Sequence, residues 1–195
     1  MPLISKSQLG RVQYAARKSM FDARRELNES ASNSFRSKDK YDVFLSHRYL
    51  DAKEVLALKT LIESFGLSVF VDWIENPELD RSRVTKETAA KLREAMERSA
   101  SLLYAQSGNS QDSKWMPWEL GYSDGLHGRI AIVPVTEQET TSESYVGQEY
   151  LGLYPYVSLR TERVSQRELL WVQESGKIYV AINDWLKGAK PTSHG

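Results

Sequence analysis

Short apolar runs alternate with stretches of helical spacing from residue 40 onward, and this alternation constrains the fold more than any other feature. The apolar runs are rich in strand-forming residues and span 41–46, 68–71, 101–105 and 130–135. The stretches between them repeat apolar residues every three or four positions and span 51–65, 84–98 and 117–126. Parallel strands joined by helical crossovers are covered by helices on both faces. The sequence therefore predicts a three-layer α/β domain.

The pattern weakens toward the C-terminus. Residues 156–159 indicate a fifth strand, whereas 136–154 are polar and irregular and 163–171 have no single period. Four apolar residues then follow at helical spacing and predict a closing helix, namely Ile178, Ala181, Ile182 and Trp185.

The first forty residues differ from the rest. Apolar residues recur at steps of three or four between 9 and 27, which predicts an amphipathic helix over 7–29, and 30–40 have the polar composition of a linker. We therefore expect a helical arm and linker over 1–39, a main domain over 40–188 and a tail over 189–195. The apolar stripe of the arm either packs on its own domain or docks on a partner or a second copy.

Composition excludes several classes of protein. The 195 residues are 41% hydrophobic, which is enough for a core, and the absence of cysteine excludes disulfides and thiolate metal sites. The three histidines, His47, His127 and His194, are too scattered to indicate a zinc cluster. The longest apolar stretch, 130–135, is far short of the roughly 20 residues of a membrane helix. We expect a soluble, cytoplasmic protein without a metal.

Charge is distributed unevenly along a chain whose formal net charge is +0. Residues 1–40 hold nine Lys or Arg against four Asp or Glu, a net +5 that leaves −5 for the remainder. Nucleic-acid binding therefore has little support outside the arm.

A tryptophan and a glutamate, Trp115 and Glu119, lie one helical turn apart just beyond the third predicted strand. The predicted helix begins at Pro117, so Glu119 lies at the carboxyl edge of the sheet, where open α/β sheets bind nucleotides. A structural alternative is that Glu119, as an acid in the third helical position, stabilises the helix dipole by roughly 0.3 to 1 kcal/mol.

Three segments resemble signature boxes of the TIR (Toll/interleukin-1 receptor) domain family. Residues 41–47, YDVFLSH, are similar to its first strand box, and 66–72, GLSVFVD, to its second strand and the entry to the BB loop. Residues 113–119, SKWMPWE, are similar to the segment that carries the catalytic glutamate of NAD-cleaving TIR enzymes. The likeness covers residues 40–188. It implies a flavodoxin-like, five-stranded parallel sheet of order 2-1-3-4-5, with a crevice between the first and third strands.

The resemblance implies that Glu119 is the catalytic residue of an enzyme that cleaves NAD+ as its substrate, without a cofactor. Nicotinamide leaves NAD+ as a neutral base and needs no acid. One carboxylate that stabilises an oxocarbenium-like transition state is then sufficient, whereas an ordinary glycosidase needs two. A linear ADP-ribose product and a cyclic one are both compatible with the sequence.

Residues near the crevice are the expected substrate contacts. Arg48 suits phosphate oxygens, and an aromatic residue in the BB loop, 72–83, suits a base. The expected set is Ser46, His47, Arg48, Asp72, Trp73 and Trp115, with core packing favoured for Trp115. Arg81 and Arg83 are further phosphate candidates. The loop looks longer than is usual in the family and carries Pro77, so residue roles within it are not carried over.

Other enzyme classes lack their motifs. No glycine-rich phosphate loop is present, no Ser-His-Asp grouping is indicated, and a receiver domain would need acidic residues after the first strand. Two alternatives are kept: a TIR scaffold that only assembles with other proteins, and an enzyme similar to the nucleoside deoxyribosyltransferases. The resemblance further implies a role in bacterial anti-phage defence, a homo-oligomer formed through the BB loop, and a downstream effector that senses the product.

Overall fold

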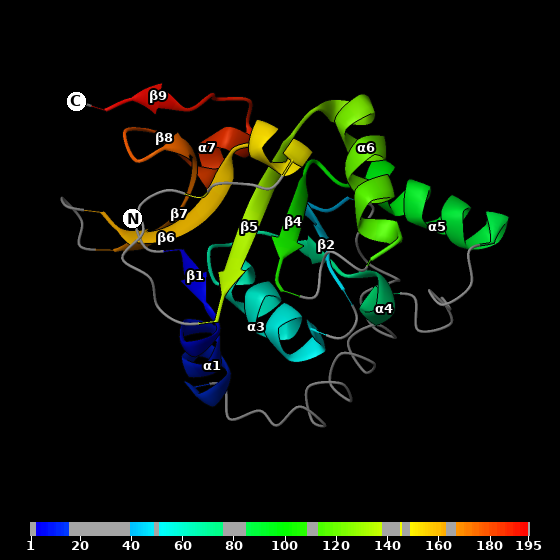
Figure 1. Cartoon of the computed structure of the whole chain (residues 1–195), viewed down its shortest axis with the longest axis horizontal. Coiled ribbons are helices and arrows are strands. Elements are labelled where there is room, and N and C mark those ends of the chain that lie inside the picture. The colour runs from blue at the N-terminus through cyan, green and yellow to red at the C-terminus, as the bar shows by residue number, and fades with distance from the viewer. Residues whose placement is uncertain are drawn as a thin grey trace.

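The computed structural model describes residues 3–15, 40–48, 51–75, 85–108, 113–137, 145, 149–162 and 167–194. A nine-stranded sheet forms the centre of this part of the chain, with the order β3-β2-β4-β5-β6-β7-β8-β9 and with β1 paired to β5. Helices flank the sheet, and α5 and α6 lie together at one side (Figure 1).

The elements follow one another closely along the described residues. The strands are β1 (Ile4–Ser5), β2 (Val43–Ser46), β3 (Val69–Phe70), β4 (Leu102–Gln106), β5 (Ile130–Thr136), β6 (Tyr156–Thr161), β7 (Glu168–Ser175), β8 (Ile178–Ala181) and β9 (Thr192–Ser193). The helices are α1 (Lys6–Ala15), α3 (Ala52–Glu63), α4 (Asp72–Glu75), α5 (Lys86–Glu97), α6 (Trp115–His127) and α7 (Ile182–Leu186), with a 3-10 turn η3 (Glu149–Leu153).

The predicted alternation of strands and helices is confirmed from β2 to β6. These strands pair in parallel in the order β3-β2-β4-β5-β6, and α3, α5 and α6 occupy the three stretches of helical spacing. Gly66 has a φ of 80°, a conformation that glycine adopts without a steric penalty, and it follows the C-terminus of α3.

The prediction of a five-stranded sheet is wrong, and the order 2-1-3-4-5 applies only to its parallel part. Three antiparallel strands, β7 to β9, extend the sheet beyond β6. The predicted closing helix is wrong in its first half, because 178–181 form β8 and only Ile182–Leu186 is helical. A short apolar run fits both periods, and pairing with β7 across the turn at 176–177 decides for the strand.

The N-terminal segment joins the domain that follows it. Ile4 of β1 pairs with Val135 of β5, and Leu9 of α1 is buried in the same core as the inner face of α3. For residues 6–15 the helix therefore packs on its own domain, which is one of the two alternatives that the sequence left. Residues 16–39, with the remainder of the predicted helix and the linker, lie outside the described residues.

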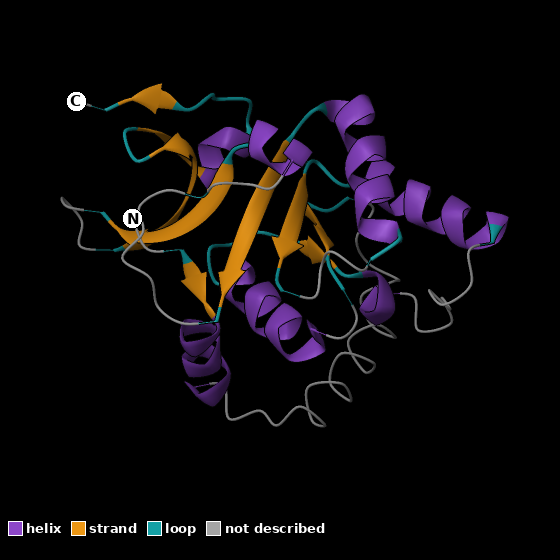
Figure 2. Cartoon of the chain, viewed as in Figure 1, coloured by secondary structure: helices purple, strands orange, loops and turns teal. Residues whose placement is uncertain are grey.

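Two apolar cores form, one on each face of the sheet (Figure 2). One core contains side chains of α1, α3 and α7, and the other contains side chains of α5, α6 and η3. Along β2, Val43 and Leu45 belong to the α3 face, and Phe44 belongs to the α6 face. Because successive side chains alternate, Ser46 is directed to the α6 face and His47 to the α3 face.

No helix among the described residues is long and apolar enough to cross a membrane.

Candidate functional site

A serine and a glutamate meet on the α6 face, at the carboxyl edge of the sheet. Ser46 ends β2, and its Oγ donates a hydrogen bond of 2.6 Å to Oε2 of Glu119 on α6. Both residues are 0% exposed. A hydrogen bond to an ionised acceptor is short and strong, so Ser46 fixes the carboxylate of Glu119 in position.

Helix α6 begins two residues earlier than the sequence predicts. Its first residue is Trp115, and Ser113 Oγ accepts a hydrogen bond of 3.2 Å from the N–H of Met116, which completes the first turn. Glu119 is therefore the fifth helical residue, and the first turn of α6 contains no acidic residue. The alternative in which Glu119 serves as a first-turn acid is wrong, because the dipole effect is confined to that turn.

Three further polar side chains lie near this pair on the α6 face. Tyr104 of β4 pairs in register with Ser46, and Gln106 lies two residues farther along the same strand. The Tyr145 hydroxyl donates to Oε1 of Gln106. Burial raises the pKa of Tyr145 to about 12, so this hydroxyl stays protonated and acts as a donor. The sequence did not single out these residues, because β4 is buried on both faces and its sequence does not show which face each side chain occupies. The register of β4 with β2 shows it.

On the opposite, α3 face, His47 belongs to a separate network. Its Nδ1 lies 2.7 Å from the carbonyl oxygen of Leu45, and Nε1 of Trp73 donates to its Nε2. Nδ1 therefore carries the ring proton and the imidazole is neutral. Asp72 Oδ1 lies 3.5 Å from the same Nε2. Because Nε2 carries no proton in this arrangement, the two atoms do not form an ion pair. His47 is 1% exposed, so the network is internal.

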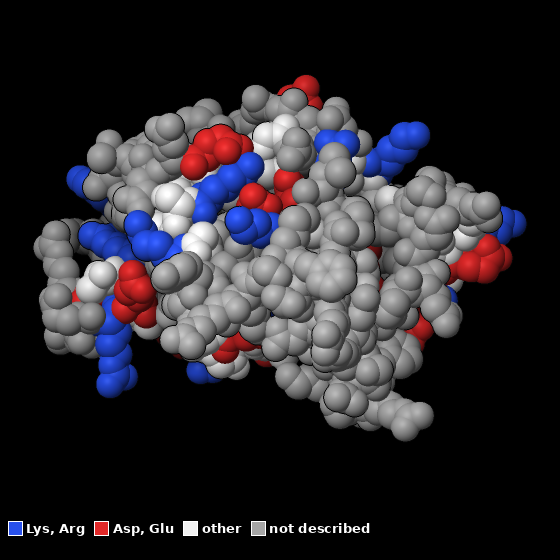
Figure 3. Space-filling view, turned by 90° about the horizontal axis from the view of Figure 1, so that it is seen from below, with Lys and Arg blue, Asp and Glu red and all other residues white. Residues whose placement is uncertain are grey.

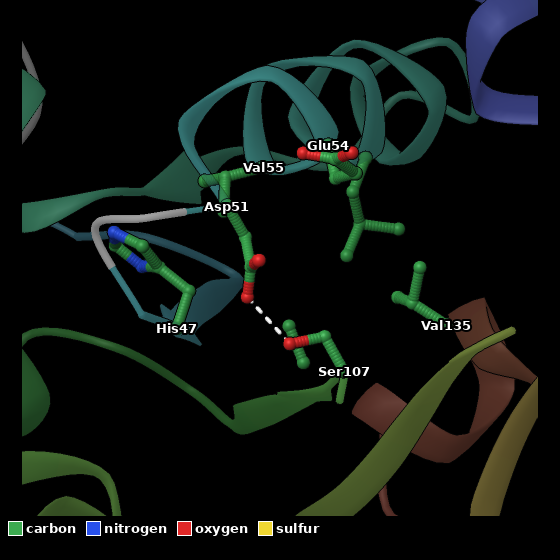
Figure 4. Close-up of a pocket in the computed structure, with 8 residues that line it drawn as sticks. His47, Asp51, Glu54, Val55, Ser107 and Val135 are labelled. Atoms are coloured by element: carbon green, nitrogen blue, oxygen red, sulfur yellow. Dashed lines mark hydrogen bonds between the residues drawn. The ribbon is translucent and has the colours of Figure 1, made fainter. Parts of the chain in front are cut away.

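A small cavity lies beside His47 at the start of α3 (Figure 4). Asp51 points across it toward Ser107, whose Oγ donates a hydrogen bond of 2.5 Å to Oδ2 of Asp51. The lining residues are His47, Asp51, Glu54, Val55, Leu58, Ala105, Ser107 and Val135. Glu119 does not line this cavity, because the sheet edge separates the two faces.

A lysine from the N-terminal helix lies close to the cavity. Lys6 Nζ lies 2.7 Å from Oε1 of Glu137, and this hydrogen bond raises the pKa of Lys6. The carboxylates of Glu54 and Asp51 add to the rise, whereas partial burial opposes it. Lys6 therefore stays charged and offsets the acidic side chains beside the cavity.

The other predicted substrate contacts differ in burial and lie on different elements. Arg48 is half-buried just after β2. Asp72 and Trp73 form the start of α4 rather than a loop, with Asp72 buried and Trp73 half-buried. Trp115 is buried and packs edge-to-face on Trp118 at 5.5 Å. Arg81, Arg83 and Pro77 of the expected BB loop lie outside the described residues.

Charge is mixed on the described part of one face of the molecule. Figure 3 looks onto the molecule from below the view of Figure 1, and basic and acidic side chains lie next to one another in the described part of that face.

Two known proteins are similar to this chain. A probable 3′ cyclic ADP-D-ribose synthase, ThsB′ of Bacillus cereus (strain MSX-D12), is 50% identical over 165 residues, which is 85% of both chains. A protein of Cytobacillus dafuensis that carries the name of a cyclic ADP-D-ribose synthase, TIR2, is 27% identical over 113 residues, 57% of this chain and 30% of that protein. No protein-family model matches the chain.

Proposed function

Because this chain belongs to the family of the TIR-type cyclic ADP-D-ribose synthases, we propose that it cleaves the nicotinamide-ribosyl bond of NAD+ and closes the ADP-ribose product into a ring. The observation that carries this proposal is the buried Glu119 carboxylate, held by Ser46 at the carboxyl edge of the sheet. NAD+ is the substrate, and the reaction calls on no further cofactor.

The first step needs only charge stabilisation. The bond between C1 of the ribose and the pyridinium nitrogen breaks, and nicotinamide leaves as a neutral base with the electron pair. The ribose acquires oxocarbenium character. A fixed carboxylate in a site screened from water stabilises this developing positive charge more than bulk water does. Glu119 is assigned this role, and Ser46 limits the movement of its carboxylate.

Ring closure follows at the same carbon. A hydroxyl oxygen of the adenosine ribose attacks C1, a C–O bond forms, and the hydroxyl releases its proton. The carboxylate of Glu119 accepts that proton and passes it to solvent, so NAD+ yields a cyclic ADP-ribose, nicotinamide and one proton. Attack by water in place of the hydroxyl gives linear ADP-ribose.

The remaining residues are proposed to bind or to orient. Arg48, half-buried at the end of β2, is suited to a phosphate, and the half-buried ring of Trp73 is suited to stack on a base. His47 and Asp72 are buried beneath Trp73 and are proposed to act indirectly, by setting the position of its ring. Trp115 is proposed to contribute through packing beside Glu119.

The biological role that we propose is signalling in bacterial anti-phage defence. In this role the cyclic nucleotide acts on a downstream effector in the cytoplasm, and a homo-oligomer completes the site through the BB loop of a neighbouring copy. Activity per molecule should therefore fall when the protein is diluted. Constant activity per molecule down to the monomer would contradict the role of a second copy.

The test is nicotinamide release from NAD+ by purified protein over a wide concentration range, with the nucleotide products separated by chromatography. Nicotinamide together with a cyclic product supports the proposal, and loss of both in Glu119→Gln assigns the site. Assembly without nicotinamide release, unaffected by Glu119→Gln, would indicate a scaffold. Exchange of bases on a deoxynucleoside with NAD+ untouched would indicate a deoxyribosyltransferase.

A further inference from the structure

A buried tyrosine lies next to the Ser46–Glu119 pair. Tyr104 of β4 is the register partner of Ser46 on β2, and partners in adjacent parallel strands direct their side chains to the same face. Tyr104 belongs to the core on the α6 face, which also contains Trp115 and Leu120 on either side of Glu119 along the helix. The ring of Tyr104 is therefore a neighbour of the proposed catalytic carboxylate.

The hydroxyl of Tyr104 makes no hydrogen bond to the residues that the structure describes. Tyr104 is 3% exposed, yet among the described residues its hydroxyl has no hydrogen bond to a protein group. Its ring is buried, but its oxygen is not among the fully buried side-chain atoms that lack a partner in the described part of the chain, so the hydroxyl is open to solvent. Three other tyrosine hydroxyls already donate to protein groups, since Tyr122, Tyr145 and Tyr154 bond to Glu97, Gln106 and Asp124. The Tyr104 hydroxyl is therefore available to a ligand, and it lies close enough to Glu119 to sense its charge.

The protonation state of this hydroxyl follows from its surroundings. Burial raises the pKa of Tyr104, and the neighbouring Tyr150 and the Glu119 carboxylate raise it further. At neutral pH the hydroxyl therefore carries its proton. It can donate a hydrogen bond to a substrate oxygen but cannot act as a base.

We propose that the Tyr104 hydroxyl binds an oxygen of the substrate beside Glu119, and that this contact positions the adenosine ribose so that its hydroxyl, rather than water, attacks C1. This inference rests on the proposed function, since it concerns the second step of that reaction. Tyr104 is a specificity-determining residue, and Glu119 remains the residue that stabilises charge and accepts the proton.

The two steps depend on Tyr104 differently. Cleavage of the C1–N bond needs the carboxylate, and Tyr104 does not touch the leaving base in this arrangement. Closure needs the attacking hydroxyl to be held within reach of C1 while the carbon is electron-poor. Removing one donor should loosen the ribose and admit water, so the intermediate is captured as linear ADP-ribose. Attack by water also forms one C–O bond at C1 and releases one proton, so the linear product needs no further reactant.

The experiment is Tyr104→Phe, which removes one oxygen atom and keeps the ring in the core. Cyclic and linear products are separated after single incubations with NAD+, and nicotinamide release is measured in the same samples. We expect the ratio of cyclic to linear product to fall by roughly threefold to tenfold, as for loss of one hydrogen bond between neutral groups, with nicotinamide release lowered less than threefold. The product ratio does not depend on how much of the protein is folded, so a purely structural role of Tyr104 would not change it.

The matched control is Tyr122→Phe. Tyr122 is on the same helix as Glu119, but its hydroxyl donates to Glu97 at 2.6 Å, away from the sheet edge. Its product ratio should equal that of the unmodified protein. Tyr104→Phe with an unchanged ratio, or an equal shift in Tyr122→Phe, overturns the inference. If the unmodified protein releases no nicotinamide, the proposed function fails instead, so the two failures are distinguishable.

Discussion

The two faces of the sheet differ sharply at the carboxyl edge, although adjacent residues of one strand supply both. Ser46 turns toward α6 and holds Glu119, beside which the Tyr104 hydroxyl has no partner among the described residues. His47 turns toward α3, where Leu45, Trp73 and the nearby Asp72 surround its ring. Both ring nitrogens of His47 on the α3 face face protein groups, whereas the α6 face places the Glu119 carboxylate beside the Tyr104 hydroxyl.

This difference indicates which side chains take part in the reaction and which stabilise the fold. A polar group that is already matched by protein is costly to redirect toward a substrate, because its own partner would be left unsatisfied. The Tyr104 hydroxyl, which makes no hydrogen bond to the described residues, has no such cost. Changes to Ser46, Glu119 and Tyr104 at the carboxyl edge should therefore act mainly on the reaction, and changes to the His47 network on the α3 face should act mainly on stability.

The largest expected effect is that of Glu119→Gln. The amide has nearly the shape of the carboxylate and still offers an oxygen to Ser46, but it lacks the charge. Loss of a preorganised electrostatic contact lowers kcat by roughly 100-fold to 1,000-fold. Nicotinamide release from NAD+ measures it, with thermal unfolding as the check on folding.

The control for this substitution is Glu97→Gln on α5. Glu97 is exposed and accepts a hydrogen bond from Tyr122, so removal of its charge should leave nicotinamide release unchanged. Substantial nicotinamide release by Glu119→Gln would show that the reaction takes place elsewhere, and it would contradict the assignment of the reaction to the α6 face.

Ser46→Ala should have the second-largest effect. It removes the 2.6 Å hydrogen bond to Glu119, and a hydrogen bond to a charged group contributes about 1.5 to 3 kcal/mol, which corresponds to roughly 10-fold to 100-fold in kcat. The matched control is Ser101→Ala, because the buried Ser101 bonds the carbonyl of Asp42 at 2.7 Å, just before β4 and away from the carboxyl edge. Equal losses of activity per folded molecule in both variants would refute the positioning role of Ser46.

Trp73→Phe tests the α3 face. Phenylalanine keeps an aromatic ring for stacking but cannot donate to Nε2 of the buried His47. Loss of that donor should lower the free energy of unfolding by about 1 to 3 kcal/mol, as measured by chemical denaturation. Nicotinamide release per folded molecule should change less than tenfold. A loss of activity as large as that of Glu119→Gln, with stability unchanged, would reverse the assignment of the two faces.

Much of this arrangement could be predicted from sequence, but not which residues share a face. The periodicity predicts β2, α6 and the position of Glu119 at the carboxyl edge, because these depend on local spacing. It does not identify Tyr104, since a strand buried on both faces has no polar alternation to read. Short elements were also missed: β1 has two residues, too few for any period, and β8 resembles a helical turn until β7 pairs with it.

Gln173 sharpens the comparison within the α6 face. It pairs in register with Tyr156 on β7 and is 0% exposed, and among the described residues neither of its amide atoms has a partner. It lies four strands from Ser46, beyond the reach that we assign to the substrate. Gln173→Met should therefore raise the free energy of unfolding by about 1 kcal/mol and leave the product ratio unchanged. A changed product ratio would extend the site across the sheet.

The smallest expected effect concerns His127, at the end of α6 away from Glu119, and it separates stability from catalysis in pH titrations. Its Nδ1 accepts a hydrogen bond of 3.0 Å from the N–H of Arg129, and burial together with the Arg129 charge lowers the pKa of His127. The unfolded chain therefore binds more protons than the folded one just below pH 6.5, and stability should fall as the pH decreases through that window. Asn at this position keeps an acceptor for Arg129 and does not titrate, so His127→Asn should flatten the dependence of the unfolding midpoint on pH. If activity at low pH falls equally in both proteins while only the unmodified one loses stability, the activity loss originates at the Glu119 site.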